Sequence, residues 1–279
     1  MKQFNAAILR FSVSMCVYGK DNPQWFETAV DSVLNQTIMP DEVVLVVDGP
    51  VPPELNEIIK KYESNDIFNV IRFAENQGHG KARRAGLEAC MYELVALMDA
   101  DDICVSDRFE QQLRCYAEYD IDIVGGNISE FIESTDNVVA CRNVPITDCE
   151  IKQYMKKRCP FNQMTVMFKK TPVQSAGGYL DWYCDEDYYL WLRMAQNGCK
   201  MMNTGTVLVN ARVGKDMYNR RGGKKYFQSE SRLQKYMLDN KLINFGTYFM
   251  NVSKRFIVQI LLPNKLRGWV FRKFARKKV

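Results

Sequence analysis

The chain has 279 residues, 47% of them hydrophobic and 25% charged, with a modest net charge of +5. This length and composition fit a soluble globular protein with one large α/β domain or two small ones, and no apolar stretch is long enough to span a bilayer. Nine cysteines are scattered without a C-x-x-C pair, which argues against a disulfide scaffold or a zinc site and for reduced thiols in a cytoplasm.

The first half of the chain alternates strand-like and helix-like segments. Residues 10–18 are rich in strand-forming side chains and predict a strand. The helix that follows has Asn22 as its expected N-cap and Pro23 at its first position. Its buried face is predicted from apolar residues at helical spacing, namely Trp25, Phe26, Ala29, Val30, Val33 and Leu34.

The alternation continues with three strands and two helices. We expect strands over residues 42–49, 68–73 and 94–98, and helices over 52–64 and 80–93. Such alternation with short connections is typical of an α/β fold with a mostly parallel central sheet and helices on both faces. Ligands of these sheets bind beyond the carboxyl ends of the strands. Tyr18, Asp48 and Asp99 each lie at such an end.

The second half is less regular. It predicts strands over 120–132, 138–142 and 163–168, a helix over 148–158, and a helix that begins near Asp185 and is capped by Gly198. We find no internal repeat and no low-complexity linker, which favours one main domain with a C-terminal appendage.

Three aspartates, Asp99, Asp101 and Asp102, follow the apolar run 94–98. Carboxylates this close repel one another and lose hydration when buried. A divalent cation, Mg²⁺ or Mn²⁺, would relieve this, because hard cations take one or two carboxylates and leave positions for water and phosphate. Two alternatives are a solvated acidic turn in which Asp102 or Ser106 caps the next helix, and a D-x-D site whose first aspartate attacks phosphorus.

Taken together, these segments resemble the inverting family 2 glycosyltransferases, and they occur in the family's order. The motifs are "SVSMCVYG", "VVLVVDGP", "ENQGHGKARRAGLEA", "LVALMDADDI", "AGGYLDWYCDEDYYLWLRM" and "RVGKDMYNRRGG". The resemblance is nearest to enzymes of bacterial O-antigen, capsule and exopolysaccharide assembly. It implies a Rossmann-like nucleotide-sugar-binding domain of the A-type glycosyltransferase fold over residues 1–223, followed by a helical, basic, membrane-associating region over 224–279.

The resemblance also implies donor-binding residues. Tyr18 would lie against the uracil ring, and Asp48 would accept the N3–H of uracil. The positively charged side chains of Lys81 and Arg83 would point at the uracil or the diphosphate. His79 is interpreted as a loop residue. A strand-end aromatic, a turn aspartate and a solvated helix face are the structural alternatives at these positions.

In the acidic triplet, the resemblance implies that Asp99 holds the ribose hydroxyls and that Asp99 and Asp101 bind Mn²⁺ or Mg²⁺. The cation would stabilise the nucleoside diphosphate as it leaves. Asp102 is left as a helix cap or a supporting carboxylate. Arg220 and Arg221 would close over the diphosphate, since guanidinium groups suit phosphate oxygens; an exposed basic turn is the alternative.

A second acidic group, Asp185 to Asp187, begins the helix near residue 185. Capping and complementarity to the helix dipole would explain it without any chemistry. The resemblance instead makes Asp187 the base that deprotonates the acceptor hydroxyl, with Glu186 as the second candidate. Trp182 and Tyr183 are candidates for stacking on an acceptor sugar or for core packing, and Gln163 stands where relatives tend to have histidine.

The end of the chain has a charge pattern of its own. Ten basic residues and no acidic residue follow Asp239, so a body of net charge −5 carries a tail of +10. Residues 264–279 place Leu266, Trp269, Val270 and Phe274 on one helical face with cations elsewhere. This pattern favours binding to an anionic inner-leaflet membrane surface over a nucleic-acid patch, because no nucleic-acid-binding motif accompanies it.

These features predict a metal-dependent inverting glycosyltransferase that acts in the cytoplasm at the inner membrane. It would transfer a hexose, glucose or galactose being favoured, from a UDP-sugar to a polyprenyl-diphosphate-linked glycan in surface polysaccharide biosynthesis. One alternative is a sugar nucleotidyltransferase of the same fold, although "SVSMCVYGKDNPQ" lacks its Gly- and Arg-rich phosphate loop. The other is a non-catalytic membrane-associated scaffold.

Overall fold

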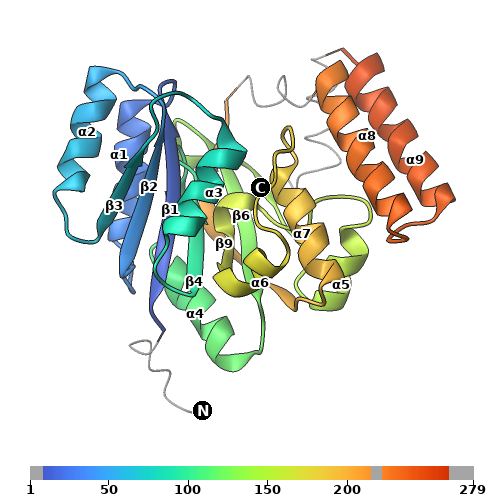
Figure 1. Cartoon of the computed structure of the whole chain (residues 1–279), viewed down its shortest axis with the longest axis horizontal. Helices are drawn as coiled ribbons and strands as arrows, with labels where there is room; N and C mark the ends of the chain where they lie inside the picture. The colour runs from blue at the N-terminus through green and yellow to red at the C-terminus, as the bar shows by residue number, and fades with distance from the viewer. Residues whose placement is uncertain (1–8, 215–221, 264–279) are drawn as a thin grey trace.

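The computed structural model describes residues 9–214 and 222–263, and these form a twisted sheet with helices on both faces (Figure 1). Within the described residues the strands are β1 (Phe11–Tyr18), β2 (Glu42–Asp48), β3 (Phe68–Arg72), β4 (Leu94–Met98), β5 (Ile103–Cys104), β6 (Ile123–Ile132), β7 (Ser134–Arg142), β8 (Met167–Lys169) and β9 (Met201–Arg212). The helices are α1 (Pro23–Leu34), α2 (Pro53–Glu63), α3 (His79–Ala89), α4 (Arg108–Glu118), α5 (Asp148–Tyr154), α6 (Lys170–Ser175), α7 (Glu186–Gln196), α8 (Lys224–Asp239) and α9 (Phe245–Phe256), with short turns η2 (Gln163–Thr165) and η3 (Ile257–Leu261).

The sheet order is β3-β2-β1-β4-β8-β6-β9-β5, with β7 paired to β6. The first four strands are parallel, and their register places Tyr18 opposite Asp48. β8 joins this block to β6 through antiparallel pairs, while β6 and β9 run parallel to each other. The α/β fold with a largely parallel sheet was therefore predicted correctly, and the carboxyl ends of β1, β2 and β4 meet at one edge.

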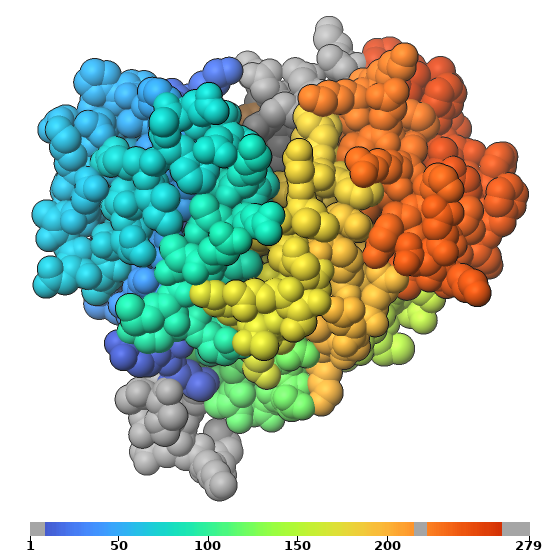
Figure 2. Space-filling view, in the orientation of Figure 1, coloured from blue at the N-terminus to red at the C-terminus, as the bar shows by residue number. Residues whose placement is uncertain are grey.

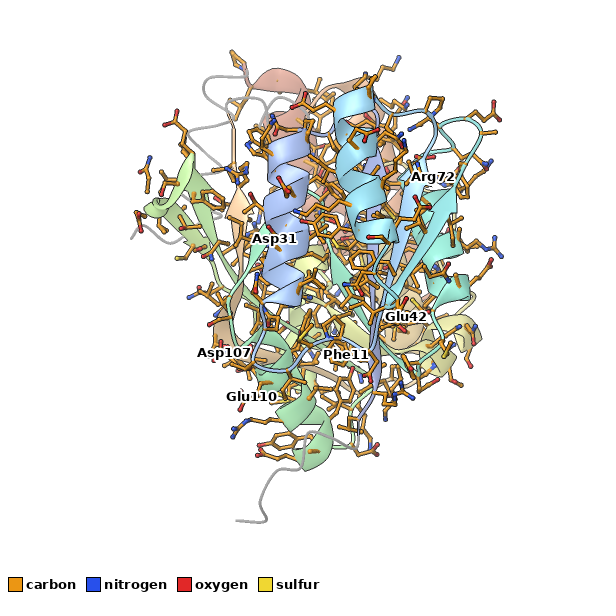
Figure 3. The ribbon with its side chains drawn as sticks, turned by 90° about the vertical axis from the view of Figure 1, so that its left-hand side faces the viewer. Phe11, Asp31, Glu42, Arg72, Asp107 and Glu110 are labelled. Atoms are coloured by element: carbon orange, nitrogen blue, oxygen red, sulfur yellow. The ribbon has the colours of Figure 1, made fainter. Side chains whose placement is uncertain are left out.

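Two hydrophobic cores hold the layers together, one on each face of the sheet. Alternate residues of the strands pack against α1, α2 and α4 on one face, and against α3, α5, α6, α7 and α8 on the other. This division follows from the strand geometry, because successive side chains point to opposite faces. Figure 3 shows α1 and α2 side by side, and the Tyr62 hydroxyl of α2 donates to Asp31 of α1 at 2.7 Å.

Helix α1 confirms its predicted start but corrects its predicted buried face. The Asn22 side chain accepts from the amides of Gln24 and Trp25, as an N-cap should. Phe26 and Val30 are buried as expected, but Trp25 is 43% exposed. The Arg212 guanidinium lies 4.7 Å from the centre of its ring. The prediction that Trp25 is buried in the core was therefore wrong. Its ring lies at the surface and contacts the Arg212 cation instead.

Other predicted boundaries also differ from the structure. Residues 163–168 were predicted as one strand, but they form the turn η2 followed by the short strand β8. The helix predicted over 80–93 ends at Ala89, before the residues that lead into β4. The helix predicted over 148–158 ends at Tyr154, and its N-cap, Thr147, forms a capping box with Glu150.

Helix α3 lies unusually close to the sheet. Gly86 faces β1 and β2, and a Cβ atom at this position would lie 2.5 Å from the Ser14 Oγ and 3.3 Å from a Val46 methyl. The missing side chain therefore fixes how near the helix axis can come to the strands.

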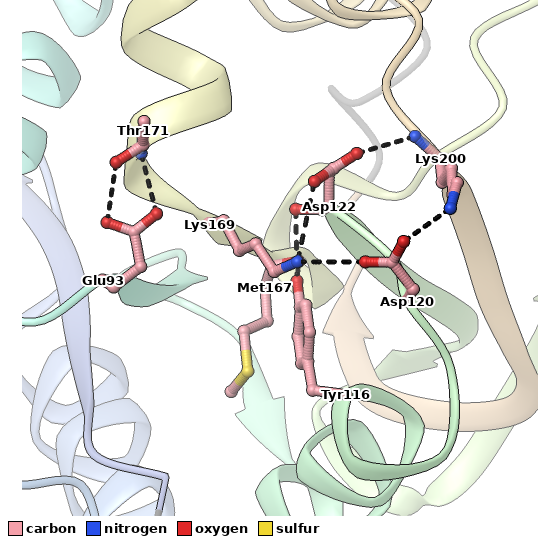
Figure 4. Close-up of polar contacts among 8 residues, drawn as sticks. All are labelled: Glu93, Tyr116, Asp120, Asp122, Met167, Lys169, Thr171 and Lys200. Carbon is pink, nitrogen blue, oxygen red and sulfur yellow. Dashed lines mark hydrogen bonds and ion pairs between the residues drawn. The ribbon is translucent and has the colours of Figure 1, made fainter.

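Polar contacts tie together the ends of β6, β8 and β9 that lie away from the carboxyl edge of β1 and β4 (Figure 4). Lys200 Nζ lies 2.5 Å from Asp120, and Lys169 Nζ lies 3.8 Å and 3.7 Å from Asp120 and Asp122. The Tyr116 hydroxyl donates to the Met167 carbonyl at 2.9 Å. These exposed ion pairs add little stability individually, but together they fix the register where the sheet changes from parallel to antiparallel pairing.

The C-terminal helices α8 and α9 form a hairpin that packs beside α7 (Figures 1 and 2). Leu233 and Met237 of α8 join the core that contains α7. The hairpin confirms helices in the C-terminal region, whereas residues 264–279, with their predicted amphipathic helix, lie outside the described residues. No helix in the described ranges is long and apolar enough to cross a membrane.

Candidate active site

A cleft of about 910 Å³ opens at the carboxyl edge of β1 and β4. Strands β1, β4, β6 and β9 form its floor, the starts of α3 and α7 form its sides, and α8, α9 and η3 contribute the remaining wall. This position agrees with the general rule for ligand sites in open α/β sheets. The predicted residues Tyr18, Arg83, Asp99, Asp101, Glu186 and Asp187 all line this cleft.

One edge of the cleft is acidic. Asp99 and Asp101 follow β4 directly, and Asp21 joins them from the loop after β1. Burial, together with the charges of Asp101 and Asp99, raises the pKa of Asp21 to about 7, against the opposing hydrogen bond from the Tyr18 amide. The carboxylates therefore repel one another in the absence of a cation, as the sequence suggested.

Asp102 supports this edge rather than capping a helix. It is buried, and its Oδ1 accepts a 2.8 Å hydrogen bond from the Arg212 amide of β9. Helix α4 instead begins after Asp107, so the capping role considered for Asp102 was wrong. Arg212 Nε returns a hydrogen bond to the Asp101 carbonyl at 3.1 Å. This pair of contacts fixes the backbone that carries Asp99 and Asp101.

Asp48 and Lys81 lie apart from the cleft lining. The two carboxylate oxygens of Asp48 accept hydrogen bonds from the Gln77 and Gly78 amides, at 2.6 Å and 2.9 Å. Asp48 thereby holds the loop that leads into α3, while the predicted contacts of Asp48 and Lys81 with uracil stay predictions. Tyr18 lies in the cleft with its ring centre 6.2 Å from that of His79.

Arg83 links the two acidic groups that the sequence singled out. Its Nη1 lies 2.7 Å from Glu186 and its Nη2 lies 3.3 Å from Asp99. Burial opposes the charged form of Arg83, but Asp99 and Glu186 outweigh burial and raise its pKa. The guanidinium therefore stays charged and holds the end of β4 to the start of α7.

The acidic start of α7 contains three carboxylates with different partners. Asp185 is buried and accepts from the Ser229 hydroxyl of α8 at 3.0 Å, and burial raises its pKa. Glu186 is paired with Arg83. Among the described residues Asp187 has no ion pair, and it accepts from the Tyr188 amide at 2.6 Å. Burial and the charge of Glu186 raise the pKa of Asp187 to about 6, although Arg83 opposes this.

The aromatic and amide candidates near α7 have separate positions. Trp182 is buried against Tyr189, at 4.4 Å between ring centres, which is the packing alternative. Tyr183 is 44% exposed in the cleft, with Lys225 Nζ 4.0 Å from its ring centre. Gln163 also lines the cleft and donates to the Tyr179 hydroxyl at 2.9 Å.

The donor set at the acidic edge fits a hard divalent cation held by few protein ligands. In the described ranges no three His, Cys, Asp or Glu side chains are grouped as a metal site. Mg²⁺ and Mn²⁺ sites that also bind substrate phosphates commonly use only one or two carboxylates. Asp99 and Asp101 would supply these, and Asp102 is engaged with Arg212.

Some cleft residues were not predicted. Asp21 was missed because it precedes Asn22 and Pro23, where a loop aspartate usually belongs to a helix start. Arg142, Lys157 and Lys254 line the cleft from segments far apart in the sequence. For Arg142 and Lys157 the only sequence signal was a positive charge, whereas Lys254 was assigned to the basic C-terminal region. Arg220 and Arg221, the predicted diphosphate clamp, lie outside the described residues.

Comparison with known proteins agrees with this geometry. Residues 12–177 match the model of glycosyl transferase family 2. The chain is 40% identical to an uncharacterised glycosyltransferase of Haemophilus influenzae, covering 96% of this chain and 100% of that one. It is 35% identical to the UDP-Gal:alpha-D-GlcNAc-diphosphoundecaprenol beta-1,3-galactosyltransferase of Escherichia coli, covering 96% and 97%, and 36% identical to the amylovoran biosynthesis glycosyltransferase AmsE of Erwinia amylovora, covering 94% and 98%.

A solved structure shows the same fold. Residues 1–349 of TarS from S. aureus, crystallised with UDP-GlcNAc, superpose with a TM-score of 0.64 at 16% identity. The match covers 89% of this chain and 73% of that chain.

Proposed function

Because the chain belongs to glycosyl transferase family 2, we propose that it is a metal-dependent inverting hexosyltransferase. It takes galactose or glucose from a UDP-sugar and adds it to a polyprenyl-diphosphate-linked saccharide. The reaction belongs to the assembly of a bacterial surface polysaccharide.

The observation that carries this proposal is the pairing of two acidic groups across one cleft. Asp99 and Asp101 lie at the end of β4, Glu186 and Asp187 lie at the start of α7, and Arg83 contacts both sides. Inverting transfer needs a leaving-group site and a base on opposite faces of the sugar. The cleft offers carboxylates for each.

Asp187 is the better candidate for the base. A general base works best when its pKa lies near the operating pH and its lone pairs are available. Asp187 meets both conditions, with a pKa near 6 and no ion pair among the described residues. Glu186 is held by Arg83, so its role is to position the guanidinium rather than to accept the proton.

The donor would bind with its nucleoside at the acidic edge. Tyr18 offers an aromatic surface for the uracil ring, and Asp99 offers oxygens to the ribose hydroxyls. A bound Mn²⁺ or Mg²⁺ would neutralise charge on the departing diphosphate. Asp101 and Asp99 would hold that ion, and Arg83 limits repulsion between their carboxylates and the start of α7.

The relatives support the acceptor class and the favoured sugar. The Escherichia coli relative is named for galactose transfer to a GlcNAc diphosphoundecaprenol. Its match covers nearly all of both chains, so the acceptor region is included. We therefore favour UDP-galactose and a GlcNAc-diphosphate lipid as the first substrates to test.

Helix α9 supports peripheral attachment to the inner leaflet of the plasma membrane, with the catalytic cleft in the cytoplasm. Phe245, Phe249 and Leu261 of α9 and η3 are 67%, 64% and 60% exposed. Met250, Phe256 and Ile257 are also exposed, whereas Asn251 is buried on the other face of the helix. An exposed apolar helix face followed by a segment whose charged residues are all basic suits the interface of an anionic bilayer.

Transfer assays test this function directly. Purified protein with Mn²⁺ and a panel of UDP-sugars would be given a synthetic GlcNAc diphosphate on a long alkyl chain. We expect one UDP-hexose to be consumed with formation of a β-linked disaccharide. Consumption of no donor would refute the proposal, and pyrophosphate release from UTP with a sugar phosphate would favour a nucleotidyltransferase instead.

A further inference from the structure

Five basic side chains line the part of the cleft that is formed with the C-terminal hairpin. This cationic wall consists of Arg142 at the end of β7, Lys157 and Arg158 after α5, and Lys254 and Arg255 at the end of α9. The segments that supply it lie far apart in the sequence. The fold therefore brings the positive charges together in a cleft whose opposite edge is acidic.

Hydrogen bonds from side chains to backbone carbonyls hold these segments together. Arg255 Nη2 donates to the Lys157 carbonyl at 3.0 Å, and Asn251 Nδ2 donates to the Lys156 carbonyl at 2.9 Å. Arg142 Nη2 donates to the Cys159 carbonyl at 2.7 Å. The end of α9 is thereby fixed against the turn after α5, which keeps Lys157 and Lys254 on the same wall.

The members of the cationic wall differ in whether they already form an ion pair. Arg255 lies 2.9 Å from Glu230 of α8, in a largely buried ion pair. Lys157 and Lys254 are exposed, and neither has an ion pair within the described ranges. These two exposed lysines line the cleft and have no ion pair among the described residues, so they can bind an anionic ligand.

Deepening the proposed function, on which this inference rests, we propose that the cationic wall binds the diphosphate of the lipid-linked acceptor. Arg142 connects the wall to the base, because its charge acts on Asp187. An acceptor sugar with its hydroxyl at Asp187 would carry its diphosphate on the other side of the ring, toward Lys157 and Lys254. Lysine and arginine are the usual partners of phosphate oxygens.

The position of the cationic wall is the reason for assigning it to the acceptor diphosphate rather than to the donor diphosphate. The donor diphosphate is assigned to Asp99 and Asp101, whose carboxylates need a cation to tolerate phosphate. Lys254 and Arg255 of the cationic wall lie on the hairpin that also carries the exposed apolar residues Phe249 and Phe256. A lipid diphosphate bound there would have its chain beside this apolar surface.

The test is the double variant Lys157→Ala/Lys254→Ala. Its matched control is Lys156→Ala/Lys235→Ala, which removes the lysine next to Lys157 and a lysine of α8, neither of which lines the cleft. In calorimetry with an alkyl diphosphate and EDTA, we expect the double variant to bind at least about tenfold more weakly than the wild type, since each lost charge-assisted contact costs affinity. The control should bind like the wild type.

Kinetics separate this inference from the proposed function. With the diphosphate-linked acceptor, the double variant should raise the acceptor KM about tenfold and leave the UDP-sugar KM unchanged. Transfer to the same sugar as an uncharged alkyl glycoside should be unaffected. Equal alkyl-diphosphate affinity in the two double variants, or a rise in the donor KM alone, would overturn the inference. Failure of the wild type to transfer any sugar would refute the proposed function, while the binding measurement would still decide the diphosphate site.

Discussion

Arg83 Nη1 lies 2.7 Å from the Glu186 carboxylate, although 103 residues separate the two positions in the chain. The same guanidinium donates to Asp99 at 3.3 Å. Helix α3 therefore supplies the connection between the strand end and the helix start that face each other in the cleft. The two sides are not independent, and a change at this arginine should affect both.

We expect Arg83→Lys to lower kcat/KM roughly ten- to hundredfold, because a lysine ammonium cannot make both contacts in the planar geometry of a guanidinium. The matched control is Arg84→Lys, since Arg84 pairs with Glu88 on the exposed side of the same helix. Steady-state kinetics on the two variants would check this. Equal activities in Arg83→Lys and the wild type would show that the bridge has no role in catalysis.

Asp187→Asn should lower kcat by roughly 10²- to 10⁴-fold with little change in the donor KM, because it removes a general base. The wild type should lose kcat/KM as the pH falls below about 6, since protonation of Asp187 removes the lone pair that accepts the acceptor proton. Glu186→Gln keeps that base and should retain the acidic limb of the pH profile. An acidic limb that survives in Asp187→Asn would contradict the assignment.

Within the acidic triplet, we expect Asp101 to be needed for catalysis and Asp102 to be needed for stability. Asp101→Asn should reduce Mn²⁺-dependent transfer by roughly a hundredfold or more, because a cation on the leaving group is worth several kcal/mol, and should leave the Tm unchanged. Removal of divalent cations with EDTA should have the same effect on the wild type. Asp102→Ala should instead destabilise the fold by about 1–3 kcal/mol, since the part-buried Arg212 amide loses its acceptor. Thermal unfolding and activity would be measured on both variants. A lower Tm in Asp101→Asn, or an unchanged Tm in Asp102→Ala, would contradict this assignment.

Asp21→Asn should stabilise the metal-free protein at alkaline pH. The raised pKa of Asp21 means that the native state binds this proton more tightly than the unfolded state. This contribution to stability is complete below pH 4 and is lost as the pH rises toward 7. The variant should therefore have a higher Tm than the wild type at pH 8 and the same Tm near pH 4, in EDTA. Asparagine retains an oxygen for the Tyr18 amide, so a lower Tm at pH 8 would refute the electrostatic explanation.

Phe249→Ser should weaken binding to vesicles that contain anionic phospholipid by roughly tenfold, because burial of a phenylalanine side chain is worth about 1.5–3 kcal/mol. Met91→Ser is the control, since Met91 is 75% exposed in the loop between α3 and β4. Co-sedimentation with anionic and neutral vesicles measures both effects. Equal binding of Phe249→Ser and the wild type would exclude α9 from the membrane contact.

Much of the fold could be predicted from local patterns. The strands before β5 and the Pro-led helices α1 and α2 follow from β-rich runs and capping signals that act over a few residues. β8 was predicted only as part of a longer strand over residues 163–168, and β9 was not predicted. Lys169 and Arg212 end strands whose pairing partners are distant in sequence, and the sheet, rather than the local chain, determines their conformation.

Site residues could be predicted where a reactive side chain stands directly next to a recognisable strand or helix in the sequence. Asp99, Asp101 and Asp187 follow a buried strand or begin an amphipathic helix, so their positions could be inferred. The ion pairs of Arg83 could not be predicted from the sequence. They form only when α3, the end of β4 and the start of α7 are brought together by the fold. The structural role of Asp48 could not be predicted either. The hydrogen bonds that its carboxylate accepts from the Gln77 and Gly78 amides depend on the conformation of a loop.

Gly86 lies less than one turn from Arg83 along α3, and only its hydrogen atoms separate the helix from Ser14 and Val46. The reach of a guanidinium is fixed by its side-chain length, so the spacing between helix and sheet determines whether it arrives at both carboxylates. One methyl group at residue 86 would push the helix outward and shift the arginine away from its partners. The alignment of the two acidic sides of the cleft thus depends on a position that contributes no functional group of its own.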